Sequence, residues 1–209
     1  MHADLAITRL AEPAAARAAE IQGRAFHDDP AFVFTFPDEG RRRERLPILM
    51  QIGIRYGARF GQVSTTEGTM LGHAVWLPPG STALSHERMN EVGFAEAAGQ
   101  LAEEELARFG GFMDLMSAHH ERLVPGPHWY LMILGVDPPW QGRGVGSGLI
   151  APTLAVADAA ALPCYLETAK ERNVAFYQRH GFDVRSEDFI PGGGPRVWMM
   201  VREPRRPGR

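Results

Sequence analysis

The chain has 209 residues, of which 44% are hydrophobic and 22% charged, and its formal net charge of -3 gives no electrostatic reason to expect nucleic acid as a partner. This length predicts one domain, and the single cysteine, Cys164, excludes a disulfide framework and a thiolate metal cluster. No apolar run reaches the roughly 18 residues of a membrane span, and the N-terminus lacks the apolar core of a signal peptide, so we expect a cytoplasmic protein with no membrane partner.

The first half of the chain mixes short strands with helices. Leu5–Leu10 alternates in polarity as a strand does, and the alanine-rich stretch after it predicts a helix that stops before Pro30, because the residue before a proline disfavours helix. Phenylalanines flank Asp28 and Asp29 in what we expect to be a loop. The elements expected up to residue 124 are a strand, two helices, a hairpin and a helical region, at residues 5–10, 11–26, 42–60, 61–77 and 86–123.

The second half predicts a regular succession of strands and helices. The expected strands are residues 128–136, 163–167, 182–185 and 196–202, and the expected helices are residues 144–161 and 169–180. Pro152 lies inside the first of these helices and should bend it or shift its start. Alternation of strand and helix is typical of α/β proteins, so we expect an α/β fold.

A glycine-rich segment follows the strand that ends at Val136 and opens the next helix. Backbone N–H groups at such a helix start lie at the positive end of the helix dipole and predict a phosphate site. A P-loop is excluded because it needs a lysine at its end, and the only lysine is Lys170. A dinucleotide fingerprint stays open: Gly146, Gly148 and Ala151 complete G-x-G-x-x-A, though this register begins about ten residues after the strand, and Glu167 could bind a ribose.

A third pattern, Gln141-x-x-Gly144-x-Gly146, follows the same strand, and the next helix adds a second signal. Asn173 and Tyr177 are four residues apart and therefore share one helical face. Thr168-x-x-Glu171 predicts a capping box at the start of that helix, and Gly181 predicts its left-handed end. Together these two segments resemble the GNAT superfamily of N-acetyltransferases.

The resemblance extends over nearly the whole chain and is sharp in four blocks. The segments RAFHDDPAFVFTFPDE, HWYLMILGVDPPWQGRGVGSGLIAP, YLETAKERNVAFYQRHGF and GPRVWMM are similar to puromycin N-acetyltransferase and its relatives. It implies one GNAT domain over residues 1–202, with a central mixed twisted sheet splayed between its fourth and fifth strands and helices on both faces. It also implies a helical, substrate-side segment at about residues 83–124 and a disordered tail at residues 203–209.

The resemblance implies acetyl-CoA as co-substrate and no metal. Backbone N–H groups of the glycine turn would bind the pyrophosphate, and the main chain before it would pair with the pantetheine amides, which Asn173 would also contact. The cofactor-binding residues so implied are Leu134, Gly135, Val136, Gln141, Gly142, Arg143, Gly144, Val145, Gly146, Ser147 and Asn173. His119-His120-Glu121 lacks the spacing of a metal-binding H-E-x-x-H motif, and we expect solvated histidines there.

Chemistry at the acetyl group assigns the remaining candidates. Tyr177 is implied as the donor to the leaving thiolate, because a phenol is still protonated at neutral pH. The attacking amine must be neutral, so a base is needed: Glu167 is the first candidate, and His128 is the competitor. Asp28, Asp29 and Phe32 could form an acidic, aromatic wall around a cationic acceptor.

The acceptor itself stays open. We expect a small amine, of the kind found in aminonucleoside antibiotics or other toxins. A peptide or protein amine is an alternative, as is a regulatory protein that binds acyl-CoA without turnover. The chain is expected to be a monomer or a homodimer.

Overall fold

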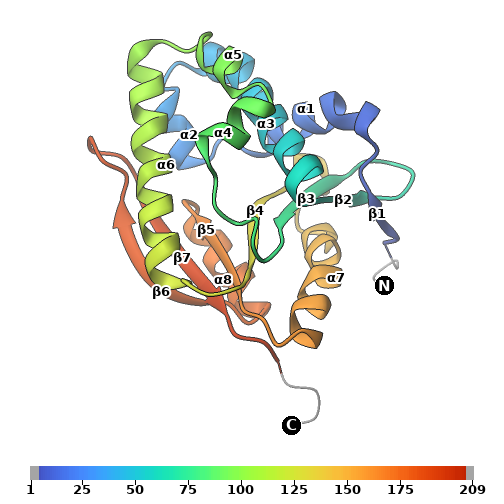
Figure 1. Cartoon of the computed structure of the whole chain (residues 1–209). Helices are drawn as coiled ribbons and strands as arrows, with labels where there is room; N and C mark the ends of the chain where they lie inside the picture. Colours follow the sequence, from blue (N-terminus) through green and yellow to red (C-terminus); the bar gives the residue numbers. More distant parts are fainter. Residues whose placement is uncertain (1–4, 206–209) are drawn as a thin grey trace.

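In the computed structural model, residues 5–205 are described, and they form a seven-stranded sheet with helices packed on it (Figure 1). The strands are β1 (Ile7–Arg9), β2 (Gln62–Thr66), β3 (Gly72–Leu77), β4 (Trp129–Val136), β5 (Cys164–Thr168), β6 (Asp183–Phe189) and β7 (Arg196–Arg202). The α-helices are α1 (Ala15–Ala25), α2 (Pro30–Thr35), α3 (Glu39–Phe60), α4 (His86–Glu91), α5 (Phe94–Ala98), α6 (Glu103–Leu123), α7 (Val145–Ala159) and α8 (Glu171–Arg179). Two short 3-10 helices are η1 (Glu12–Ala14) and η2 (Pro138–Trp140).

The sheet is mixed, with the strand order β1-β2-β3-β4-β5-β7-β6. Only the β4–β5 pair is parallel among the described strands; every other neighbouring pair is antiparallel. The expected α/β fold, with a mixed sheet and helices on both faces, is confirmed.

Alternate residues of β3 show how the sheet is covered. Ala74 and Trp76 pack against one face of α7, around Leu149, whereas Val75 on the opposite face packs with α1 and α3. Since successive side chains of a strand point to opposite faces, this strand, buried at every position, is covered on both sides.

The sheet opens between β4 and β5. These strands pair at only two positions, Trp129 with Cys164 and Tyr130 with Tyr165, and beyond them β4 stays with β3 while β5 stays with β7. A bulge in β4 leaves Met132 without a partner on β3. The expected splay between the fourth and fifth strands is therefore present, and it creates the space that the site occupies.

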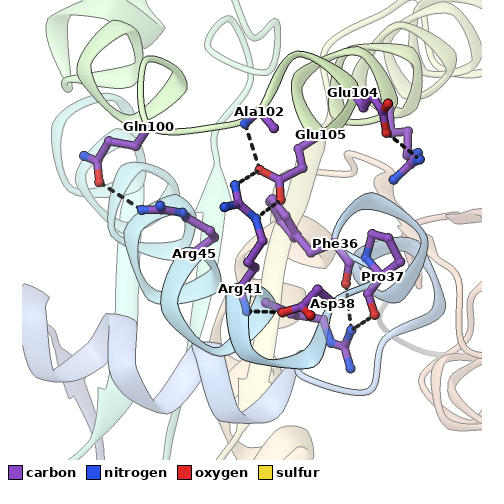
Figure 2. A network of polar contacts seen from close by, with 11 residues as sticks. Phe36, Pro37, Asp38, Arg41, Arg45, Gln100, Ala102, Glu104 and Glu105 are labelled. Atoms are coloured by element: carbon purple, nitrogen blue, oxygen red, sulfur yellow. Dashed lines mark hydrogen bonds and ion pairs between the residues drawn. The ribbon is translucent and has the colours of Figure 1, made fainter.

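The segment α4–α6 lies over this opening, and α6 is held at both ends. At its start, Arg41 of α3 makes a two-pronged ion pair with Glu105, at 2.7 and 2.8 Å, and Glu105 also accepts from the Ala102 N–H (Figure 2). At its other end, His119 lies 3.0 Å from Asp188 of β6. Figure 1 shows α6 running alongside the β6–β7 edge of the molecule.

Three local expectations are wrong. The phenylalanine segment is a helix, α2, because Asp29 caps it with a bond from Ala31 N–H to its side chain and Pro30 fits a first helical position. The capping box at Thr168 does not form: Thr168 belongs to β5, and α8 begins three residues later with Lys170 as N-cap. His120 is buried rather than solvated.

Other boundaries move by a few residues. The α3 helix starts before the expected Arg42, since Asp38 caps it by accepting from Arg41 N–H at 2.8 Å. The α7 helix continues through Pro152, and Gly181 has the expected positive φ, +89°. Of the expected tail, residues 206–209 lie outside the described part of the chain.

Candidate active site

The glycine turn connects the end of β4 to the start of α7. Gly142 and Gly144 have φ angles of +73° and +84°, which residues with a side chain rarely adopt. Gly144 is the N-cap of α7, so backbone N–H groups of the first helical turn lie at the positive end of the helix dipole. Gln141 Nε2 donates to the carbonyl oxygen of Val136 at 3.0 Å, which ties the turn to the strand end.

A groove extends from this turn along α8, and we call it the glycine groove. Its lining includes most of the cofactor candidates, namely Leu134, Gly135, Val136, Gln141, Gly142, Gly144, Val145, Gly146, Ser147 and Asn173. Lys170, Arg172 and Arg179 of the α8 region line it as well. Cationic side chains beside a helix N-terminus favour phosphate groups. The groove therefore has the donors and the charge of a site for a phosphorylated ligand.

Where β4 and β5 diverge lies a cavity of about 170 Å³, which we call the inner cavity. Its wall is mostly apolar and rich in phenylalanine and methionine: Phe26, Phe32, Phe94, Phe109, Phe112, Met50, Met89, Met113, Met116 and Met132. The groups in it that can act on a proton are few, chiefly Tyr177, Asp29 and Glu167.

Tyr177 and Asp29 stand where the glycine groove meets the inner cavity, since both line the two spaces. Burial raises the pKa of the Tyr177 phenol, and the charge of Asp29 adds to that. The hydroxyl therefore keeps its proton at every working pH and can donate it in a hydrogen bond. Burial also raises the pKa of Asp29, which nearby Lys170 partly offsets.

Glu167, near the end of β5, lines the inner cavity but not the glycine groove. Burial raises the pKa of its carboxyl to about 8, and the hydroxyls of Tyr130 and Tyr165 offset part of this shift. Its Oε1 is buried and has no hydrogen-bond partner in the described chain. A carboxyl in this state can accept a proton from a ligand near neutral pH.

A second, wider space of about 780 Å³ adjoins the inner cavity, and we call it the vestibule. It lies between α4–α6 and the start of β4, and Glu167 and Tyr130 line both spaces. His120 and His128 line it as a pair, with their Nε2 atoms 2.6 Å apart. Since His128 Nδ1 lies 2.6 Å from the Gly126 carbonyl oxygen, its Nε2 is the acceptor and His120 is the donor when both rings are neutral.

Burial keeps this pair neutral. It lowers the pKa of His120 to about 3, with a contribution from His128, and it lowers the pKa of His128. The His120 ring also stacks on Tyr165, with centroids 4.3 Å apart. The pair is thus a fixed neutral wall of the vestibule rather than a ready base.

The structure brings most of the predicted residues to one place but not all. Phe32 lines the inner cavity, whereas Asp28 is exposed and lines neither it, nor the glycine groove, nor the vestibule. Arg143 is absent from the lining of the groove; its guanidinium lies 5.1 Å from the centroid of Trp140. His128 lines the vestibule but not the inner cavity.

Sequence reasoning missed the cations of the groove. Lys170 had a signal of its own, because it is the only lysine in a chain that otherwise uses arginine and it lies two residues after the end of a strand. Arg172 and Arg179 had none, since both look like ordinary exposed residues of an amphipathic helix.

Comparisons with known proteins show the family and the fold of the chain. The sequence model of the acetyltransferase (GNAT) family matches residues 67–182. An uncharacterized N-acetyltransferase of Schizosaccharomyces pombe is 25% identical over 187 residues, covering 86% of this chain and 76% of that protein.

Two solved structures show the fold. One, described as a histone acetyltransferase and related acetyltransferase from Corynebacterium glutamicum, has a TM-score of 0.68 at 22% identity and covers 98% of this chain and 99% of that one. Arylalkylamine N-acetyltransferase 2 from Aedes aegypti has a TM-score of 0.62 at 10% identity, over 96% and 99%. On the family match, which spans more than half of the sequence, the chain belongs to the acetyltransferase (GNAT) family and is an N-acetyltransferase.

Proposed function

We propose that this N-acetyltransferase transfers the acetyl group of acetyl-CoA to the amine of a small molecule, by direct attack with both substrates bound. One observation carries the proposal: Tyr177 and Glu167 face the same inner cavity, Tyr177 from the glycine groove and Glu167 from the vestibule. A donor for the leaving sulfur and an acceptor for the amine's proton thus line one reaction space.

The glycine groove fits the cofactor on the chain's own features. Backbone N–H groups at the start of α7, together with Lys170, Arg172 and Arg179, suit the phosphates. The edge of β4 from Leu134 to Val136 that would face β5 is not paired with it, so main-chain groups on that side can pair with the pantetheine amides. When bound there, acetyl-CoA supplies the acetyl group as a thioester.

Each residue then has one task. Glu167 accepts the proton that the amine loses as its nitrogen bonds to the acetyl carbon. A backbone N–H near Val136 polarises the carbonyl, as a preorganised donor should. Tyr177 donates a hydrogen bond to the sulfur as the carbon–sulfur bond breaks; its raised pKa favours donation over full loss of the proton.

The site favours a small molecule over a protein amine. The inner cavity is small and apolar, and it is reached through a vestibule roofed by α4–α6, which suits a compact acceptor better than a long extended chain. The solved structures described above carry names of both kinds, a histone acetyltransferase and an arylalkylamine acetyltransferase, so likeness of fold does not choose between them. A non-catalytic acyl-CoA sensor has no use for an acceptor space that contains a buried carboxyl.

The test is release of free thiol from acetyl-CoA with puromycin, simple primary amines and short peptides. In Tyr177→Phe we expect turnover to fall about 100-fold, because the sulfur loses its donor, while the KM for acetyl-CoA changes less than about threefold. Thiol release with peptides alone would instead favour a protein acceptor. Tight binding of acetyl-CoA without release from any amine would favour the sensor.

A further inference from the structure

The charges around the vestibule are one-sided. The vestibule is lined by the carboxyl groups of Asp114, Glu121 and Glu167, and among the described residues no lysine or arginine lines it. The glycine groove is the opposite, since Lys170, Arg172 and Arg179 line it against one carboxyl, that of Asp29. The two approaches to the inner cavity therefore differ in sign.

This absence of cations comes from how the arginines of α4 and α6 are placed. The guanidinium of Arg88 lies 5.0 Å from the centroid of Phe60, and that of Arg108 lies 5.8 Å from the centroid of Phe34. Arg122 donates to Ser186 of β6, at 3.3 Å. Each of these arginines has a partner away from the vestibule.

Most of the residues that line both the vestibule and the inner cavity are apolar, and we call this boundary the apolar ring. Phe109, Met113 and Met116 line both spaces and stand four and three residues apart, so they form one stripe of α6. Glu167 is the one carboxyl that lines both spaces in the described chain. Methionine side chains adapt their shape and make favourable contacts with aromatic groups, so the apolar ring can accommodate a flat apolar part of a ligand.

We infer that the vestibule is the acceptor's entrance and that it selects a primary amine with one apolar, preferably aromatic, body and no anionic group. The inference rests on the proposed function and names the substrate class of the same site. The amine enters past Asp114 and Glu121, its nitrogen reaches Glu167, and its apolar body lies along the α6 stripe. The inner cavity, about 170 Å³, is similar in size to a cavity that holds benzene, so little beyond the reacting groups fits inside.

Another kind of amine meets a penalty at the apolar ring. A carboxylate next to the amine would be buried beside Glu167 with no cation to pair with it. Amino acids should therefore be poor acceptors.

Matched amines test this directly. We expect kcat/KM for 2-phenylethylamine and phenylalaninamide to exceed that for phenylalanine at least about tenfold, because burying an unpaired charge is costly. If amines are acetylated but phenylalanine does as well as 2-phenylethylamine and phenylalaninamide, the inference is wrong and the proposed function stands.

If no amine is acetylated, the proposed function fails, and calorimetry with CoA present still tests the entrance. Binding of 2-phenylethylamine at least about tenfold tighter than phenylalanine would support the inference, and equal or absent binding of both would overturn it.

Variants on α6 locate the selection. Asp114→Lys should raise the KM for 2-phenylethylamine several-fold with little change in kcat, and the effect should fade in high salt. Glu104→Lys is the control, since Glu104 is on the same helix but lines neither the inner cavity nor the vestibule. Met113→Trp should lower kcat/KM for 2-phenylethylamine more than for ethylamine. Equal effects of the two lysine variants would contradict an entrance at this place.

Discussion

Glu167 has a buried carboxyl oxygen and also lines both the inner cavity and the vestibule, where a ligand could reach it. Burial raises its pKa to about 8, so near neutral pH much of it is protonated in the free protein. Only the carboxylate form can take a proton from an amine. Activity should therefore increase as the pH rises through the pKa of Glu167, on top of any increase that comes from deprotonation of the amine itself.

Replacing Glu167 with glutamine should remove that increase. We expect kcat/KM to fall about 100-fold, the usual contribution of a general base, and the limb of the pH profile near 8 to disappear. The measurement is kcat/KM from pH 6 to pH 10 for two amines of different pKa. The limb that belongs to the amine moves between the two, and the limb that belongs to Glu167 does not. A variant with an unchanged profile would place the base elsewhere, with His128 the first to examine.

At the scale of elements, α6 lines both the inner cavity and the vestibule, and its start depends on one ion pair, between buried Glu105 and partly exposed Arg41. The Glu105 side chain is only 7% exposed and is satisfied by Arg41 and by the Ala102 N–H. Removing one partner of such a pair leaves a buried charge unmatched. The position of α6, and with it the ring of Phe109, Met113 and Met116, should then loosen.

Arg41→Gln should therefore lower the melting temperature and raise the KM for the amine several-fold, while the KM for acetyl-CoA stays nearly constant. The glycine groove should be unaffected because none of the residues that line it is on α6. Arg43→Gln is the matched control two residues away: its ion pair with Glu39 is exposed on both sides, and such pairs contribute little. If the control variant behaves like Arg41→Gln, the anchor is not what positions α6.

The elements could be predicted where one local pattern had one meaning. The sequence predicted β4, α7 and α8 from three such patterns. These were an apolar run, the glycine-rich segment after it and the four-residue spacing of Asn173 and Tyr177. Asp29-Pro30 was ambiguous, because the same pair ends one helix and begins the next, and only packing decides. Thr168 could not cap α8 because its pairing with Trp198 holds it in the sheet.

The acceptor side was less visible in the sequence for the same reason. His120 continues the stripe of Phe109, Met113 and Met116, which is a signal that it is buried, but its partner His128 is on another element. Which arginines turn away from the vestibule depends on contacts with Phe34, Phe60 and β6 that no local pattern specifies.

At the scale of the whole molecule, buried histidines link stability to pH. Burial lowers the pKa of His73 to about 4 and that of His120 to about 3, and it also lowers the pKa of His128 and His180. The unfolded chain therefore binds protons that the folded chain does not. Their contribution is fully present above the ordinary histidine pKa of 6.5 and is lost as the pH falls from there towards the folded values. Glu167, with its raised pKa, works in the opposite direction between about 8 and its ordinary value of 4.5.

His73 isolates one of these contributions. Its ring is fully buried, and Gln22 Nε2 lies 3.2 Å from its Nδ1. Because a glutamine side chain is similar in size to that of histidine, glutamine can replace His73 without leaving a sizeable cavity. Between pH 6.5 and pH 4.5 the parent protein should lose about 2 kcal/mol more free energy of unfolding than His73→Gln, because only the parent must keep a neutral imidazole. Urea unfolding at a series of pH values measures this difference, in which the other titrating groups cancel. Parallel curves for His73→Gln and the parent would mean that the buried ring accepts its proton without unfolding.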